Sequence, residues 1–147
     1  MRTALLSTDA RIGVEGPFKI GLNEVQVGLF LPPVIYKVMR RLVGSRQAER
    51  LCVGGLLVSS AEAARIGLVD ELTPHERVVE RAIEWCRSLL ALPPKAMTAT
   101  RRLARADLAA LFAGDDEEEI LGVLNEWFSD ETQKVMRDVA ERLTRKK

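Results

Sequence analysis

Two short alternating segments near the start of the chain constrain its fold more than any other feature. Residues 10–15 and 18–22 alternate weakly between apolar and other side chains, and Gly16-Pro17 separates them, which predicts strand, turn and strand. Even with a third short strand over residues 68–72, these strands are too few and too short to form an independent sheet. We therefore expect the partner strands to come from outside this chain, either from an oligomer or from the rest of a larger fold.

The remainder of the chain has the spacing and punctuation of helices. Apolar side chains recur every three or four residues after Pro32, and glycine, proline and serine mark the ends of the segments. Ser45, Ser59 and Ser129 are expected to cap helix N-termini. The predicted helices are a segment opened by Pro32-Pro33 and stopped by Gly44, residues 46–53, a short helix from Ser60 to Gly67, a long segment after Thr73-Pro74, residues 95–112, a segment that begins near Asp115, and residues 130–147. The long segment carries an apolar stripe that we expect to be buried: Val78, Val79, Ala82, Ile83, Trp85, Cys86, Leu89 and Leu90.

Composition excludes several classes of protein. The apolar share of 47% and charged share of 29% are ordinary for a globular domain, and a formal net charge of +1 gives no reason to expect a nucleic-acid or membrane partner. No apolar run approaches the roughly 20 residues of a membrane span. Cys52 and Cys86 are too few for a disulfide framework or a metal site, so we expect two free, buried thiols, no metal, and a cytoplasmic location.

One carboxylate stands out as a candidate for chemistry. Glu24 follows a predicted strand and is surrounded in sequence by apolar residues. If it is buried there, it could act as a general base near neutral pH. The alternative is a solvated glutamate in a turn, which composition alone favours. Solvated surface roles are the more ordinary explanation for the remaining candidates, which are His75, the acidic run 115–119 and the arginine pairs.

Several segments together resemble the crotonase superfamily of enoyl-CoA hydratases and isomerases. Residues 18–28 (FKIGLNEVQVG) are similar to the family's catalytic-strand segment, and residues 48–51, Gly55 and 60–70 to the run that ends in Gly-Leu-Val. Residues 129–134 and 141–143 resemble the last helix of the isomerases. The resemblance covers essentially the whole chain but only the C-terminal half of the family's chain. It implies an α/β, mostly helical fold, the C-terminal half of a crotonase-like (ClpP/crotonase) spiral. A short N-terminal β segment and a core remnant would occupy residues 1–72, and a helical oligomerisation region residues 73–147.

The resemblance also implies an activity. Glu24 would be the general base of an enzyme acting on fatty acyl-CoA thioesters, and Leu29 and Phe30 would line the substrate site. Acyl-CoA would be the substrate, with no separate cofactor, and the protein would be a homo-oligomer, a trimer or hexamer. The second glutamate of hydratases aligns with Thr3, which favours a 3,2-enoyl-CoA isomerase. The family's oxyanion donors would lie in the upstream half, one of them immediately before Met1, so a non-catalytic subunit that assembles with other chains is the alternative.

Overall fold

The structure is a computed structural model that describes residues 6–113 and 117–145 of the chain. Its contacts group the chain into two compact units. One unit comprises the described parts of residues 1–20 and 58–114, and the other the described parts of residues 21–57 and 115–147. Each unit draws on both halves of the sequence. The predicted division of this chain into residues 1–72 and 73–147 stays a prediction.

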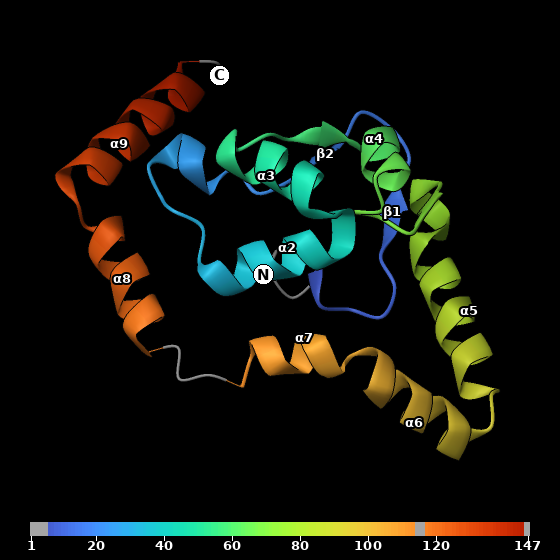
Figure 1. Ribbon diagram of the computed structural model, residues 1–147. Helices are drawn as coiled ribbons and strands as arrows, with labels where there is room; N and C mark the ends of the chain where they lie inside the picture. Colours follow the sequence, from blue (N-terminus) through green and yellow to red (C-terminus); the bar gives the residue numbers. More distant parts are fainter. Residues whose placement is uncertain (1–5, 114–116, 146–147) are drawn as a thin grey trace. The chain divides into compact units, whose positions relative to one another are not determined.

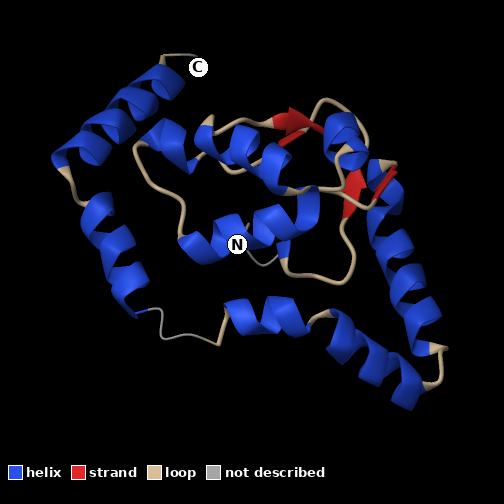
Figure 2. Cartoon of the chain, in the orientation of Figure 1, coloured by secondary structure: helices blue, strands red, loops and turns tan. Residues whose placement is uncertain are grey.

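The first unit contains two small sheets, each of two strands (Figure 2). Strand β1 (Ile12–Val14) pairs in parallel with β4 (Glu71–Thr73), and β2 (Lys19–Ile20) pairs antiparallel with β3 (Val58–Ser59). The expectation that partner strands must come from outside the chain is therefore wrong for these segments. A strand of two residues such as β3 is too short to show a period in the sequence, and β4 begins three residues later than the predicted strand at residue 68.

The helices of the first unit follow the proline and glycine punctuation, with two corrections (Figure 1). The elements are α4 (Ser60–Arg65), η2 (His75–Arg77), α5 (Val78–Leu90), α6 (Pro94–Ala104) and α7 (Ala106–Leu111). The single helix predicted over residues 95–112 is broken at Arg105, which joins α6 to α7. No residue of α5 is buried, and Val79 is 67% exposed, so the predicted burial of its apolar stripe is wrong. The period of a helix shows which side chains share a face, but not whether this chain covers that face.

The second unit is built on two helices that pack against each other, α2 (Pro33–Val43) and α3 (Ser45–Val53), as Figure 1 shows. The side chains buried in this pair of helices are Ile35, Val38, Met39, Ala48, Leu51 and Cys52. Gly44 makes the turn between the helices with a φ of 77°, a conformation that favours glycine. Ser45 is consequently the first helical residue and not the predicted N-cap.

Two serine caps are confirmed. Ser59 Oγ accepts a bond from the backbone N–H of Glu62 at 3.2 Å at the start of α4. Ser129 Oγ does the same for Thr132 at 3.2 Å, at the start of α9 (Asp130–Thr144), which follows α8 (Glu117–Trp127). These bonds satisfy helix N–H groups that have no intrahelical acceptor. A serine placed three residues before such an N–H group therefore predicts the start of a helix.

One of the two thiols is exposed and not buried as expected. Cys52 is buried and free, as predicted, whereas Cys86 on α5 is free but exposed. The reason is the uncovered face of α5, to which Cys86 belongs. Within the part of the chain that the structure describes, no helix combines the length and the apolar character needed to cross a bilayer.

A buried carboxylate on a clamped turn

Glu24 is the first residue of a single 3₁₀ turn, η1 (Glu24–Val27), in the second unit. The turn ends at Gly28, whose φ of 79° lies in the left-handed region, and whose N–H is directed at the carbonyls of Glu24 and Val25. The N–H of Leu29 donates to the Glu24 carbonyl at 3.0 Å. The backbone of Glu24 is thus fixed by the residues that follow it.

Other elements of the same unit hold this turn from outside. Thr132 Oγ1 of α9 donates to the Gly28 carbonyl at 2.6 Å, and Gln26 Nε2 reaches the Gly54 carbonyl just after α3 at 3.4 Å. Gly55 leaves the space for Gln26, because a Cβ at Gly55 would lie 2.8 Å from Gln26 Cγ. A short turn with no buried residue of its own is therefore positioned by two helices.

One oxygen of the Glu24 carboxylate combines burial with an unused acceptor position. Its Oε2 atom is buried, and no described residue donates a hydrogen bond to it. Cys52 of α3 is close enough for the charge of Glu24 to act on it: burial, and secondly that charge, raise the pKa of the Cys52 thiol. Buried polar atoms are nearly always paired, so this unpaired carboxylate oxygen indicates a partner from outside the described residues, such as a ligand.

The two predicted substrate-binding residues come directly after this turn. Leu29 is half-buried, while Phe30 is 42% exposed. The Phe30 ring lies beside α8, since a Cβ at Gly122 would be 3.6 Å from Phe30 Cζ. The structure thus brings Glu24, Leu29 and Phe30 into one short segment, and their roles toward a substrate stay predictions.

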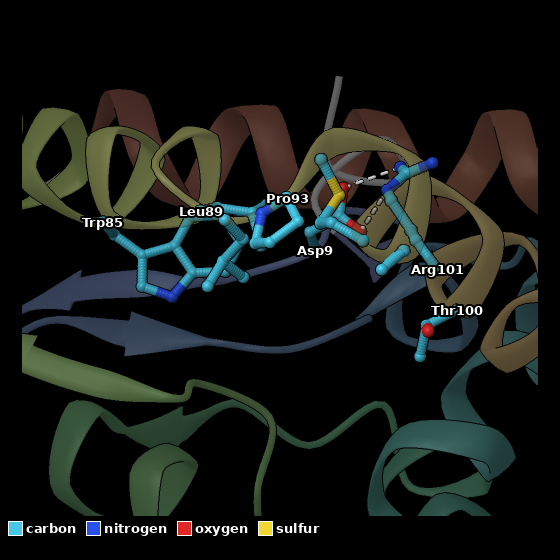
Figure 3. Close-up of a pocket in the computed structure, with 9 residues that line it drawn as sticks. Asp9, Trp85, Leu89, Pro93, Thr100 and Arg101 are labelled. Carbon is cyan, nitrogen blue, oxygen red and sulfur yellow. Dashed lines mark hydrogen bonds and ion pairs between the residues drawn. The ribbon is translucent and has the colours of Figure 1, made fainter.

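A hollow of about 480 Å³, which was not among the sequence-based predictions, lies in the first unit (Figure 3). Trp85 and Leu89 of α5 face Pro93 and the start of α6 across it. Arg101 at its rim forms a bidentate ion pair with Asp9, at 2.8 and 2.7 Å. The signal in the sequence is the Pro93-Pro94 break, which turns α6 away from α5 and leaves their apolar faces opposite each other. Glu24, Leu29 and Phe30 do not line this hollow, whereas Arg101, a member of one of the arginine pairs, does.

The remaining candidates do not assemble into a site. His75 is exposed in η2. Thr3 and residues 115–116 of the acidic run lie outside the described residues. Among the side chains that the structure describes, which do not include those of residues 117–120, no group of three or more His, Cys, Asp or Glu could hold a metal ion.

Comparison with known proteins assigns the chain to a family. The family described as Enoyl-CoA hydratase/isomerase matches residues 4–145, so the chain belongs to the enoyl-CoA hydratase/isomerase family. Among individual proteins it is similar to human enoyl-CoA delta isomerase 1, mitochondrial, with 31% identity over 97% of the chain and 47% of the human protein. The mouse protein of the same name is also 31% identical, over 97% of the chain and 50% of its own length. The chain therefore spans about half the length of the curated relatives it matches.

Solved structures confirm the predicted fold class. The crystal structure of human mitochondrial Δ3-Δ2-enoyl-CoA isomerase superposes with a TM-score of 0.85 and 31% identity, covering 97% of this chain and 55% of that one. A carnitinyl-CoA hydratase from Mycobacterium avium gives a TM-score of 0.77 at 23% identity, covering 94% and 54%, which supports the fold alone. The chain has the mostly helical C-terminal half of the crotonase fold.

Proposed function

We propose that this chain carries the general base of an enoyl-CoA isomerase that acts on fatty acyl-CoA thioesters. Glu24 takes a proton from C2 of a 3-enoyl-CoA, the electron pair moves onto the thioester oxygen, and the proton is returned at C4 as the double bond forms between C2 and C3. The observation that carries this proposal is the buried Oε2 of Glu24, to which no described residue donates. An unpaired oxygen can accept a substrate proton without first breaking a hydrogen bond within the protein.

Two further observations support a single base. Thr3, the residue that aligns with the second glutamate of hydratases, has no carboxylate. The other described carboxylates nearest to the turn in sequence are Asp9, Glu15 and Glu49, and all three are exposed. A proton shuttle within one substrate needs one group that can take and return a proton, whereas adding water also requires the water to be held and deprotonated.

The charge that builds on the thioester oxygen needs hydrogen-bond donors. In the enoyl-CoA hydratase/isomerase family, these donors belong to the half of the protein that precedes the segment corresponding to this chain. The chain is therefore to be assayed together with any in-frame sequence that precedes Met1 in its gene. Formation of the conjugated 2-enoyl-CoA from a 3-enoyl-CoA is followed by its ultraviolet absorbance.

Glu24→Gln tests the proposal with little change of shape. We expect turnover to fall by about 100-fold or more, the usual effect of removing a general base. Glu76→Gln is the matched control, because Glu76 is exposed in η2 of the other unit, and it should keep the parental rate. Equal turnover of Glu24→Gln and the parent would refute Glu24 as the base.

A non-catalytic subunit is the second candidate, and the uncovered apolar face of α5 favours it. A subunit of this kind would associate with other chains but would convert no enoyl-CoA in any preparation. Absence of turnover by the parent, together with stable association, would select this candidate over the first.

A further inference from the structure

The first turn of α9 makes a buried polar contact with the end of the turn that carries Glu24. Thr132 is completely buried, which is rare for a side chain with a hydroxyl group. Its Oγ1 donates to the Gly28 carbonyl at 2.6 Å, across 104 residues of sequence. Its own backbone N–H is held by the Ser129 cap at 3.2 Å, so the helix turn that presents the hydroxyl is itself fixed.

The contact extends from Gly28 to Glu24 through the backbone. The peptide N–H of Gly28 is directed at the carbonyls of Glu24 and Val25, and the Leu29 N–H donates to the same Glu24 carbonyl at 3.0 Å. Gly28 is also packed tightly, since a Cβ there would lie 3.1 Å from Thr132 Cα. The Thr132 hydroxyl, the peptide group that joins Gly28 to Leu29, and the Glu24 carbonyl thus form one chain of hydrogen bonds.

We propose that Thr132 is a positioning residue, whose hydroxyl holds η1 so that the Glu24 carboxylate stays at its place of reaction. The inference rests on the proposed function of Glu24. Efficient proton transfer requires the reacting atoms to be held within a fraction of an ångström, and displacements of about 1 Å can cost 100-fold in rate. The turn has no buried residue of its own, so the bond from α9 supplies order that η1 lacks.

The test separates the hydroxyl of Thr132 from its methyl group. Thr132→Val keeps the methyl and the shape but removes the donor, whereas Thr132→Ser keeps the donor and removes the methyl. Thr144→Val is the matched control in the same helix, because the Thr144 hydroxyl donates within α9, to the Ala140 carbonyl at 2.9 Å. All variants are made in the protein as its gene encodes it, and kcat, KM and amide hydrogen exchange at Leu29 are measured.

We expect Thr132→Val to lower kcat by about ten-fold or more with KM within about two-fold, and to speed exchange of the Leu29 amide. Thr132→Ser and Thr144→Val should stay near the parent in both measurements. A parental kcat in Thr132→Val, an unchanged Leu29 exchange rate, or an equal loss in Thr132→Ser would overturn the inference. If a variant has no measurable kcat, the exchange rate of its Leu29 amide still shows whether the turn η1 is held in place.

Glu24→Gln, measured beside these variants, distinguishes the two levels of the proposal. If Glu24→Gln retains the parental rate, the proposed function is wrong. If Glu24→Gln is inactive while Thr132→Val is fully active, the base stands and only the positioning role falls.

Discussion

Cys52 reports on the carboxylate beside it. Burial raises the pKa of its thiol, and the charge of Glu24 raises it further, since a negative charge disfavours the thiolate. Glu24→Gln removes that charge, so the pKa of Cys52 should fall and its alkylation should begin at lower pH. Peptide mass spectrometry after iodoacetamide treatment at a series of pH values measures this shift.

The exposed Cys86 serves as the internal control, with the same pH dependence in both proteins. It should also react faster than Cys52 throughout, because it needs no opening of the structure. A Cys52 profile that is identical in Glu24→Gln and the parent would contradict the proximity of the two side chains.

Gly21, just ahead of the candidate base, is required by the space around it. A Cβ there would lie 2.4 Å from the Leu56 carbonyl oxygen, a backbone atom that cannot rotate away. We expect Gly21→Ala to lower the free energy of unfolding by about 1–3 kcal/mol, as overpacking does. Gly122→Ala is the control: its Cβ meets Phe30 Cζ at an ordinary 3.6 Å in the middle of α8, and should raise stability by about 0.4–1 kcal/mol. Urea unfolding measures both, and a neutral Gly21→Ala would refute the close approach.

At the scale of elements, Asp9 joins the N-terminal segment to α6 and α7. It accepts two hydrogen bonds from Arg101 and one from Arg105 at 3.1 Å. The bond from Arg101 is the main reason that the pKa of Asp9 is lowered, with burial acting against it. Because the folded value lies below the unfolded one of about 3.9, the stabilisation is present above that pH and is lost as pH falls through the lowered value.

We therefore expect the melting temperature of the parent to fall more steeply below about pH 4 than that of Asp9→Asn. The effect should be modest and reduced by salt, because the side chains are 49% and 31% exposed for Arg101 and Asp9. Glu76→Gln, at an exposed position, should follow the parent curve. Parallel curves for Asp9→Asn and the parent would show that the ion pair contributes nothing to stability.

Local chemistry explains which elements could be predicted from the sequence. Ser59 and Ser129 cap the helices they precede, and Gly44 ends α2, because each acts on backbone within a few residues. Pairing of β1 with β4 joins residues about 59 apart in sequence, such as Ile12 and Glu71, which no local pattern encodes.

The candidate site shows the same limit. The sequence identifies Glu24 as a carboxylate among apolar residues, but its neighbour Cys52 on α3 and the clamp from Thr132 on α9 come from segments distant in sequence. Thr132, in a helix of charged and apolar residues, carries no local signal of a tertiary role. The period of α5 predicts an apolar face correctly, yet the described part of the chain buries none of the residues of this helix.

At the scale of the whole molecule, exposed apolar side chains favour assembly. Val79 is 67% exposed and Leu90 is 76% exposed on α5, and Phe128 is 73% exposed between α8 and α9. Burying such faces gains roughly 25 cal/mol per Å² of apolar area. We expect oligomers in sedimentation velocity at about micromolar concentration, and weaker association when Val79 and Leu90 are both changed to Ser. A compact, stable monomer would contradict this expectation, and the trimer or hexamer stays a prediction.

At the scale of the whole protein, the ratio of the isomerisation rate to the hydration rate tests the proposed reaction. We expect the protein, assayed as its gene encodes it, to convert a 3-enoyl-CoA to its 2-isomer at least about 100-fold faster than it adds water to a 2-enoyl-CoA. In the proposed reaction, isomerisation needs one carboxylate, that of Glu24, whereas hydration also needs a group that holds and activates the water. The residue expected at that second position, Thr3, has a hydroxyl and no carboxylate.

Thr3→Glu should then raise the rate of hydration, while Thr3→Gln, which has the same length but no base, should not. Both rates can be followed in one absorbance assay, because isomerisation forms the conjugated 2-enoyl thioester and hydration removes it. Efficient hydration of a 2-enoyl-CoA by the unchanged protein would overturn both the preference for isomerisation and the alignment of Thr3. A Thr3→Glu variant that hydrates no faster, in a protein that isomerises well, would overturn the alignment alone and leave Glu24 as the base.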